Sequence, residues 1–458
     1  MPSEVKSVAD GGVAVARTSL SRILGLGFGI AVMFGGTVGA GILRLPGEIA
    51  RQLGSFWPIM LVWAAGGCYS LLGAISVAEL GTAMPQAGGF YIYSKRAFGA
   101  RAGFAIGWAD WLNNCAVVAY GAVAAADYLG ALFPGMAARQ TSVALALVFL
   151  FCALHWSGLR LSSSLQELTS SVTAVTFLLL AAACLLHPVR ANTVVVSAGF
   201  TRGSGLLQML APVVAALRAI VVTYDGWYES IYFTEEDTDV SKHLPKAMIG
   251  GVLIVTGLYL LMNLAFLHVL SIPALSVSKL PAADAARIVF PAWGGSFVTV
   301  LSLLTLLSLI SAVLLGAPRI LFAIGRDGLF TERAARVGAG GTPRVALLLS
   351  AAAAATLIAS GTFENIIAVA AILIAVIYCV NYIAVITLRI REPEMVRPFR
   401  AWGYPVTTVL VLVGSLLFLI AAVHDDPRSA AWAAALLAAA VPLYTWMRWK
   451  QRRTLAHL

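Results

Sequence analysis

The chain has 458 residues, of which 60% are hydrophobic and 11% are charged, and its mean hydropathy is +0.88. Soluble domains carry about 25% charged residues, so this composition excludes a soluble fold and indicates a protein that crosses a membrane several times. The net charge of +10 needs no nucleic acid partner, because basic residues that face anionic lipid headgroups account for it.

The N-terminal stretch to about Ser21 is polar and has no cleavable hydrophobic segment, so we predict a tail at 1–23 and no removed signal peptide. Behind it, a window of about 19 residues predicts an all-α integral membrane protein with twelve spans. The spans are expected at 24–53, 55–83, 102–132, 140–157, 164–187, 207–233, 246–271, 296–325, 344–360, 364–389, 404–423 and 430–447. A second tail is predicted at 449–458.

Basic residues fall mostly on one side of this topology. If the N-terminus is inside, the outer segments hold only Arg51, Arg139, Arg190, Arg202, Lys279, Arg287 and Arg428. An excess of Lys and Arg is typical of cytoplasmic loops. The pattern therefore predicts a multi-pass protein of the plasma (inner) membrane with both termini cytoplasmic.

Glycines interrupt the first predicted span at Gly35, Gly36, Gly39 and Gly41. Each costs a helix interior about 1 kcal/mol, and an unwound turn in hydrocarbon leaves polar groups unpaired unless they line a cavity or meet a ligand. Freed N–H groups from Gly39 to Leu43 would lie at the positive end of the outer half-helix, which suits a carboxylate. The alternative is that these glycines only allow close helix packing.

A second interruption is predicted in the sixth span, where Asp225 and Gly226 fall mid-membrane. Carbonyl groups freed around Val222, Thr223 and Tyr224 are expected to accept hydrogen bonds from an ammonium group, and Asp225 adds charge. A local helix cap is the alternative for Asp225. Five spans separate the two breaks, which predicts inverted five-helix units at 24–190 and 205–391, with two peripheral helices at 403–448.

Arg44 and Arg218 lie within predicted spans, where an arginine costs at least about 2.5–3.5 kcal/mol, so each needs a partner or water. Glu48 follows Arg44 by four residues, which predicts an ion pair at the outer vestibule. Snorkelling toward the headgroups is the alternative. Arg218 is expected to close an outer gate with an acid such as Asp127 or Glu48.

Several motifs are combined in one chain. They are Gly39-Ala40-Gly41-Ile42-Leu43 with Pro46, Ala78-Glu79-Leu80-Gly81, Pro85-Gln86-Ala87-Gly88-Gly89, Tyr224-Asp225-Gly226-Trp227, Thr234-Glu235-Glu236 and Leu244-Pro245-Lys246-Ala247. Together they resemble the amino acid–polyamine–organocation superfamily, and its L-type amino acid transporters most. The resemblance implies the sodium/leucine symporter fold, a 5+5 inverted repeat with discontinuous helices 1 and 6, alternating access and an amino acid substrate.

On this resemblance the substrate is expected to lie between the two breaks. The residues that would hold its main chain are Gly39, Ala40, Gly41 and Ile42 on one side, and Val222, Thr223, Tyr224 and Asp225 on the other. Thr37 and Trp227 are expected to shape the side-chain pocket. Ala40 stands where similar permeases usually carry serine, which leaves the carboxylate to backbone donors.

The coupling ion stays open at this point. Many similar permeases have a lysine in the fifth span, whereas an ungapped alignment puts Thr173 there, with Ser170 as the alternative. Ser308 and Ser311 in the eighth span offer hydroxyl oxygens to sodium, or bond only to their own helix. Glu229 is a candidate for gating or proton transfer, although relatives place a glutamate one position earlier.

These observations predict a secondary active transporter for amino acids, working as an exchanger or as a sodium- or proton-coupled symporter. The rivals are a transport-inactive receptor, sensor or scaffold of the same fold, and a polyamine or organic cation transporter. An enzyme is not expected, because the chain has no metal cluster, nucleophile elbow or phosphate loop. No metal and no cofactor are predicted, and the oligomeric state is left open.

Overall fold

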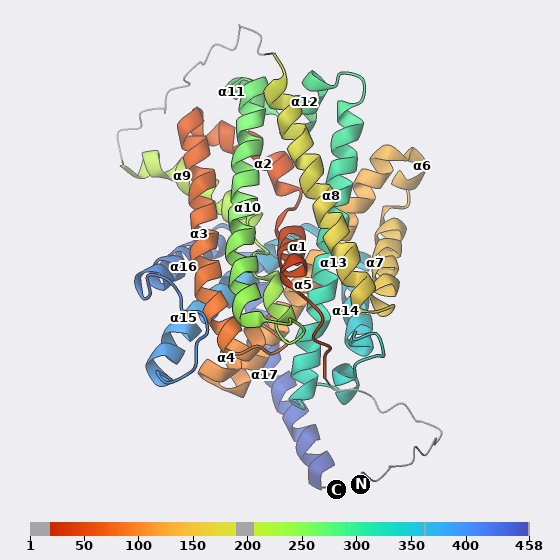
Figure 1. Cartoon of the computed structure of the whole chain (residues 1–458), viewed down its shortest axis with the longest axis vertical. Helices are drawn as coiled ribbons and strands as arrows, with labels where there is room; N and C mark the ends of the chain where they lie inside the picture. Colours follow the sequence, from red (N-terminus) through yellow and green to blue (C-terminus); the bar gives the residue numbers. More distant parts are fainter. Residues whose placement is uncertain (1–18, 189–205, 361–362, 457–458) are drawn as a thin grey trace, which may run out of the picture.

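The structure is a computed structural model that describes residues 19–188, 206–360 and 363–456, and these residues form a bundle of α-helices (Figure 1). Among them, eight helices are each long and apolar enough to cross a membrane. These are α3 (Phe56–Ala83), α5 (Ala100–Leu132), α8 (Leu159–Leu186), α10 (Val240–Val269), α13 (Gly294–Arg326), α15 (Phe363–Arg391), α16 (Val406–Asp425) and α17 (Pro427–Ala456). An all-helical, multi-pass membrane protein is thereby confirmed.

The first predicted span is broken where the glycines predicted a break. Helix α1 (Leu26–Thr37) and helix α2 (Gly41–Leu53) meet at an angle of 48° and are together long enough to cross the membrane. Three shorter apolar helices lie at further predicted spans, namely α7 (Gln140–Trp156), α9 (Leu206–Thr223) and α14 (Arg344–Ala359). The count of twelve spans and the inverted repeat stay predictions.

The sixth predicted span also ends in a break. Helix α9 stops at Thr223, a turn covers 224–228, and a single 3₁₀ turn, η1 (Glu229–Phe233), follows. Gly226 has φ +100° in this turn, a conformation that glycine adopts without steric cost.

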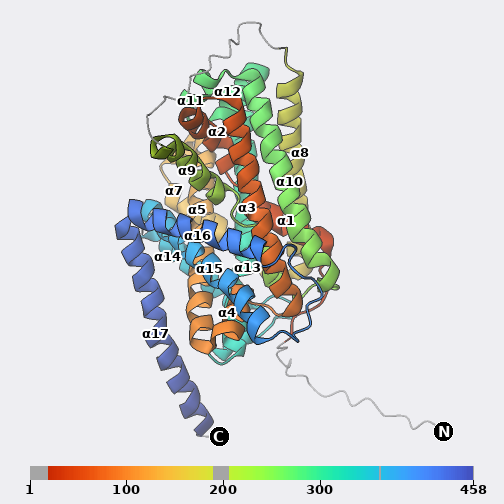
Figure 2. The same cartoon turned by 90° about the vertical axis from the view of Figure 1, so that its left-hand side faces the viewer.

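Short helices connect the spans: α4 (Phe90–Phe98), α6 (Pro134–Ala137), α11 (Ile272–Val277), α12 (Pro281–Val289) and the 3₁₀ turn η2 (Glu332–Ala335). Helix α17 continues to Ala456, through most of the predicted tail at 449–458. The first described residues and the end of α17 lie toward the same, lower end of the bundle (Figures 1 and 2).

Burial separates a central core from peripheral helices. In α13, 72% of the apolar stretch is buried inside the protein, against 17% of the corresponding stretches in α16 and in α17. Figure 2 shows α16 running across the bundle and α17 along its edge. The exposed apolar faces of these two helices suit contact with lipid, whereas α13 packs against α1, α5 and α8.

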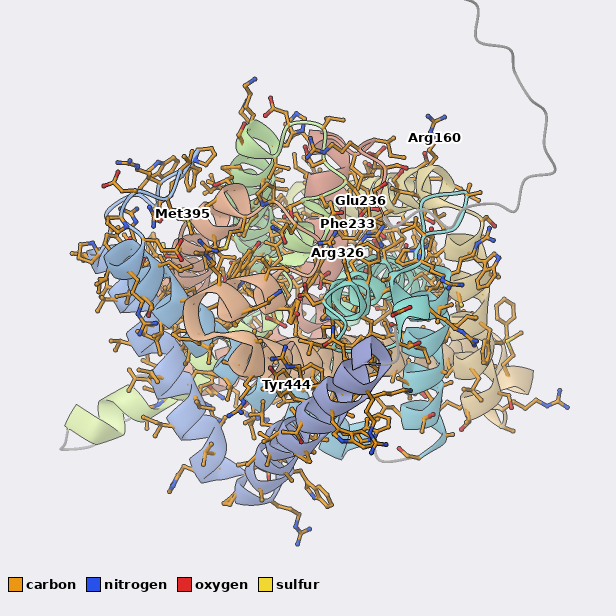
Figure 3. All side chains as sticks on the ribbon, turned by 90° about the horizontal axis from the view of Figure 1, so that it is seen from below. Arg160, Phe233, Glu236, Arg326, Met395 and Tyr444 are labelled. Carbon is orange, nitrogen blue, oxygen red and sulfur yellow. The ribbon has the colours of Figure 1, made fainter. Side chains whose placement is uncertain are left out.

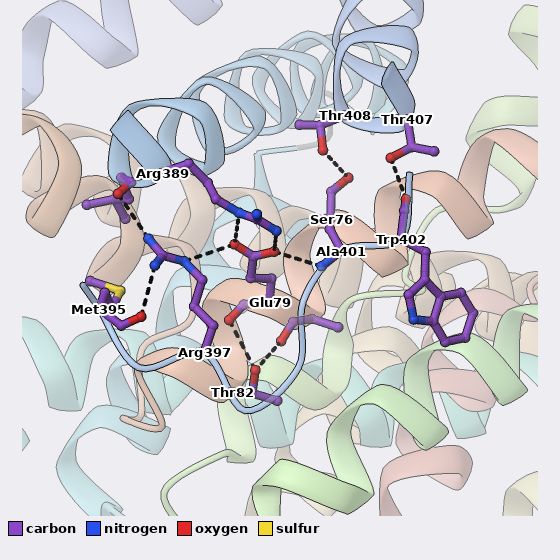
Figure 4. Close-up of polar contacts among 12 residues, drawn as sticks. Ser76, Glu79, Thr82, Arg389, Met395, Arg397, Ala401, Trp402, Thr407 and Thr408 are labelled. Atoms are coloured by element: carbon purple, nitrogen blue, oxygen red, sulfur yellow. Dashed lines mark hydrogen bonds and ion pairs between the residues drawn. The ribbon is translucent and has the colours of Figure 1, made fainter. Parts of the chain in front are cut away.

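Two buried ion pairs tie elements together at the lower end. Glu79 in α3 receives two hydrogen bonds from Arg389 (2.7 and 2.5 Å), one from the backbone N–H of Ala401 (2.7 Å) and a contact from Arg397 (3.1 Å; Figure 4). The Glu79 side chain is 1% exposed. A buried charge of this kind persists only with partners.

The second pair joins Arg319 in α13 to Glu236, which follows η1, with N···O distances of 2.5 and 2.8 Å. The Arg319 guanidinium also lies 4.3 Å from the centre of the Phe233 ring. Phe233, Glu236 and the nearby Arg326 are seen together from below in Figure 3. These contacts bind the segment after the second break to the core helix α13.

Candidate functional site

The two breaks touch each other through glycines. A Cβ atom on Gly41 would lie 2.8 Å from the Thr223 side chain, and one on Gly226 would lie 2.4 Å from the carbonyl oxygen of Gly36. Both distances are too short for a side chain to fit without displacement. The glycines therefore allow the unwound segments to meet.

Tyr259 of α10 bridges the same two segments. Its hydroxyl lies 3.2 Å from the carbonyl oxygen of Thr37 and 3.1 Å from that of Thr223, which are the last helical residues of α1 and α9. One hydroxyl proton is thus shared between the two helix ends. Nothing in the local sequence around Tyr259 marks this role.

The start of α2 offers free hydrogen-bond donors. The helix has no side-chain cap, and the Leu43 N–H bonds to the carbonyl of Ala40 at 3.2 Å. Among the described residues, the backbone N–H groups of Gly39, Ala40, Gly41 and Ile42 have no acceptor. Unpaired N–H groups at a helix N-terminus form an anion-binding position.

A cavity of about 370 Å³ opens beside the breaks, within the size range of small-molecule sites. Eight of the predicted residues line it: Thr37, Gly39, Ala40, Gly41, Arg44, Val222, Thr223 and Asp225. The wall also contains Tyr69, Asn113, Tyr120, Leu309, Ile374, Tyr378 and Phe418. Reasoning from the sequence missed these, because they come from distant helices and share no motif.

Three predicted site residues lie behind the cavity wall. The Ile42 side chain is fully buried. The Tyr224 hydroxyl donates to the Trp63 carbonyl at 3.1 Å, away from the cavity. Trp227 packs against the ring of Tyr378, with 5.5 Å between ring centres. Trp227 therefore supports the wall from behind. The sequence had suggested that it would shape the pocket surface, but Trp227 is not among the residues that line the cavity.

Asp225 is the acid that faces the cavity. It accepts a hydrogen bond from the Tyr378 hydroxyl, and its own N–H bonds to the carbonyl of Val222 at 3.3 Å. In the described part of the chain no Lys, Arg or His pairs with it. A carboxylate without a cation partner at a cavity wall suits a positively charged ligand group.

The predicted partners of the membrane arginines need correction. Arg44 donates to the Tyr128 hydroxyl at 3.2 Å, while Glu48 pairs with Arg51 and accepts a bond from Gln52 at 2.9 Å. The Arg44–Glu48 pair is therefore replaced. The side chain of Arg44 extends toward α5. Arg51 lies one helical turn after Glu48 and forms the ion pair with it.

Arg218 forms an ion pair with Asp425 at the end of α16, and not with Asp127 or Glu48. Asp127 instead accepts a hydrogen bond from Gln140. Arg218 therefore links α9 to a peripheral helix, and a gate across the cavity is not formed by these groups.

The hydroxyl residues of the fifth and eighth spans meet beside α1. Ser170 donates to the Ala31 carbonyl at 2.7 Å and lies 3.2 Å from Ser308. The amide nitrogen of Gln166 fills the same place, at 3.0 Å from Ser170, 3.2 Å from Ser308 and 3.3 Å from the Ala31 oxygen. Of the two aligned positions, Ser170 and not Thr173 makes this contact.

The other coupling candidates make fewer contacts. The hydroxyl groups of Thr173 and Ser311 are buried and have no hydrogen-bond partner among the described residues. Glu229 is 2% exposed and packs against Gly36 and Gly316. No group of three His, Cys, Asp or Glu residues in the described segments is placed to hold a metal ion.

Comparison with known proteins gives one family and consistent relatives. A family model described as amino acid permease matches residues 27–446. The chain is 25% identical to the serine/threonine exchanger SteT of Bacillus subtilis (strain 168) over 447 residues, covering 94% of this chain and 97% of that relative. It is 26% identical to the b(0,+)-type amino acid transporter 1 of Mus musculus over 423 residues, covering 90% and 84%. It is 24% identical to the large neutral amino acids transporter small subunit 2 of Mus musculus over 460 residues, covering 97% and 83%. The residues matched by the family model include both breaks and the residues that line the cavity.

Proposed function

Because the chain belongs to the amino acid permease family, a family of transporters and not of enzymes, we propose that it carries amino acids across the membrane by alternating access. The observation that supports this most is the pairing of opposite chemistries at one cavity. Free N–H donors begin α2, while Asp225 stands in the wall formed by the second break. A zwitterion with adjacent carboxylate and ammonium groups matches both.

The carboxylate would bind the N–H groups at Gly39, Ala40, Gly41 and Ile42, where the dipole of α2 is positive. The ammonium group would lie toward Asp225 and the carbonyl groups of the second break. Ala40 adds no hydroxyl, so the backbone supplies the donors. A polyamine has no carboxylate to use them, which favours an amino acid over that alternative.

Exchange of one amino acid for another is the mode that we favour, because a relative that matches nearly the whole chain is named as an exchanger. We further propose twelve spans arranged as two inverted five-helix units, each beginning with a broken helix. The cavity borders α2, the outer half of the first span, and the buried ion pairs of Glu79 and Arg319 hold the lower end together. This arrangement would represent the outward-facing stage of the cycle, with both termini in the cytoplasm.

Exchange in proteoliposomes tests the proposal. Vesicles loaded with unlabelled L-serine should take up labelled L-serine, and vesicles without protein serve as the control. A panel of neutral, cationic and acidic amino acids then defines the side-chain class by competition.

Two analogues test the pairing of groups: ethanolamine lacks the carboxylate, and glycerate lacks the ammonium group. Neither should compete. Competition by putrescine but by no amino acid would support the polyamine alternative. Amino acid binding without exchange would support a receptor.

A further inference from the structure

Two acids that the proposed substrate site does not use lie on either side of one tyrosine. Asp110 of α5 is fully buried, and Glu229 of η1 is 2% exposed. The Tyr232 hydroxyl donates to Asp110 Oδ1 at 2.8 Å. A Cβ atom on Gly316 would lie 3.0 Å from both Glu229 Oε2 and the Tyr232 ring, so the Glu229 carboxyl sits beside that ring.

This cluster has more hydrogen-bond acceptors than donors. Asp110 Oδ2, Glu229 Oε2 and Asn114 Oδ1 are buried without a partner among the described residues. The Asn114 amide already donates to the Asp110 carbonyl at 2.8 Å and to its Oδ1 at 3.2 Å. A buried acceptor without a donor is destabilising, and more so when it is charged.

Among the described residues, no Lys, Arg or His forms an ion pair with Asp110 or Glu229. The second break adds Asp225, a further acid, which accepts from Tyr378 of α15. On helix α1, Gly36 packs against the Glu229 side chain. On α13 the next charged group is Arg319, and Glu236 occupies it at 2.5 and 2.8 Å. Buried carboxylates without a counter-charge favour the protonated form.

We propose that Asp110, Tyr232 and Glu229 form a proton-binding site of this protein. The proton comes from water: a hydronium ion gives it to one carboxylate and becomes water, and no other bond changes. The protonated carboxyl becomes a donor, so one proton removes a charge and satisfies an acceptor oxygen at the same time.

The site adjoins the proposed substrate cavity through Gly36, which lines that cavity and contacts Glu229. Its negative charge adds to that of Asp225 in attracting an ammonium group. Proton binding and amino acid binding therefore oppose each other, and an arriving amino acid releases a proton. This consequence rests on the proposed function, whereas proton binding itself does not.

Infrared spectroscopy of the purified full chain tests the proton site directly. The carbonyl band of protonated buried carboxyl groups should disappear as the pH rises. The double variant Asp110→Asn, Glu229→Gln should lose most of this band. Glu332→Gln, at an exposed position, is the matched control and should keep it. An unchanged band in the double variant overturns the proposal.

Tyr232→Phe keeps both acids and the packing of the ring. It removes the donor that stabilises the charged form of Asp110, so the titration midpoint should move to higher pH by about one unit. An unmoved midpoint contradicts the assignment even if the double variant fails to fold.

Proton release on adding L-serine, followed by a pH dye in weak buffer, tests the link to transport. Wild type should release protons, and the double variant should not. If L-serine fails to bind, the proposed function fails while the infrared result still decides the proton site. Loss of the band on adding sodium at constant pH would make this a metal cation site and would overturn the proposal.

Discussion

At the scale of single residues, the candidate site depends on glycines, which leave space that a side chain would fill. Gly41 and Gly226 have no side chain, and their neighbours occupy the space that one would take. The sequence predicted both breaks, because glycine inside an apolar span is locally visible. It did not predict that Arg44 contacts Tyr128 or that Gln166 reaches α1, because partners 84 and 135 residues away leave no local pattern.

Gly41→Val is expected to weaken L-serine binding at least about tenfold, equal to 1.4 kcal/mol. Its Cβ would press on Thr223 at 2.8 Å, and its methyl groups would fill the approach to the free N–H donors. Gly257→Val in α10, where no atom lies within 4 Å, is the matched control. Both proteins should be inserted and monodisperse. Near-normal affinity in Gly41→Val would rule out the backbone site.

At the scale of elements, the contact of α1, α8 and α13 bears on sodium. The oxygens of Ala31, Ser170 and Ser308 would be needed to hold a hard cation. They already surround the Gln166 amide nitrogen at 3.0 to 3.3 Å. Ser308 of the hydroxyl pattern on the eighth span lies at this contact, but the amide nitrogen of Gln166 from α8 lies among the same oxygens. The cation site itself stays a prediction.

We therefore expect labelled L-serine uptake to be equal in sodium and in potassium media. Gln166→Ala frees the three oxygens and is the variant in which a sodium effect would emerge. Initial rates in proteoliposomes at matched ionic strength provide the measurement. Sodium stimulation of wild type that Ser308→Ala abolishes would show that the amide yields its place to the ion.

The Glu79 cluster predicts a second effect at this scale. Glu79→Gln should lower the free energy of unfolding by about 3–5 kcal/mol, because it leaves two arginines without their buried counter-charge. Denaturant unfolding in mild detergent measures it. Glu392→Gln removes the exposed partner of Arg96 (2.8 Å) and should cost less than about 1 kcal/mol. Equal effects would mean that the Glu79 cluster contributes no more than a surface pair.

At the scale of the whole molecule, hydropathy predicted the helical segments well, since each of the twelve predicted spans coincides with a helix or with a broken pair. The arrangement of these helices in space was harder to predict from the sequence. Helix α16 crosses the bundle and α17 follows its edge (Figure 2), although α16 is as apolar as the core helix α13. Hydropathy shows that a helix lies in an apolar environment, but it does not show which other helices it packs against.

The orientation in the membrane is testable with cysteines introduced on either side of α10. Cysteine in place of Lys242, near the start of α10, should react with impermeant thiol reagents only from inside. Cysteine in place of Lys279, between α11 and α12, should react only from outside. Cys68 is exposed and is replaced by serine in both proteins, which also provides the unlabelled control. The opposite labelling would invert the topology.

The hydrogen bonds that Tyr259 makes to both helix ends have a consequence for the rate of exchange. Its hydroxyl already bonds to the Thr223 carbonyl of the second break, toward which the ammonium group would lie, so an arriving amino acid exchanges one hydrogen bond for another. The net gain is about 1 kcal/mol, less than tenfold in affinity. A weakly bound amino acid dissociates quickly, because differences in affinity lie mostly in the dissociation rate. Tyr259→Phe is thus expected to hold L-serine more tightly and to turn over more slowly, which binding and exchange measured on one preparation would reveal.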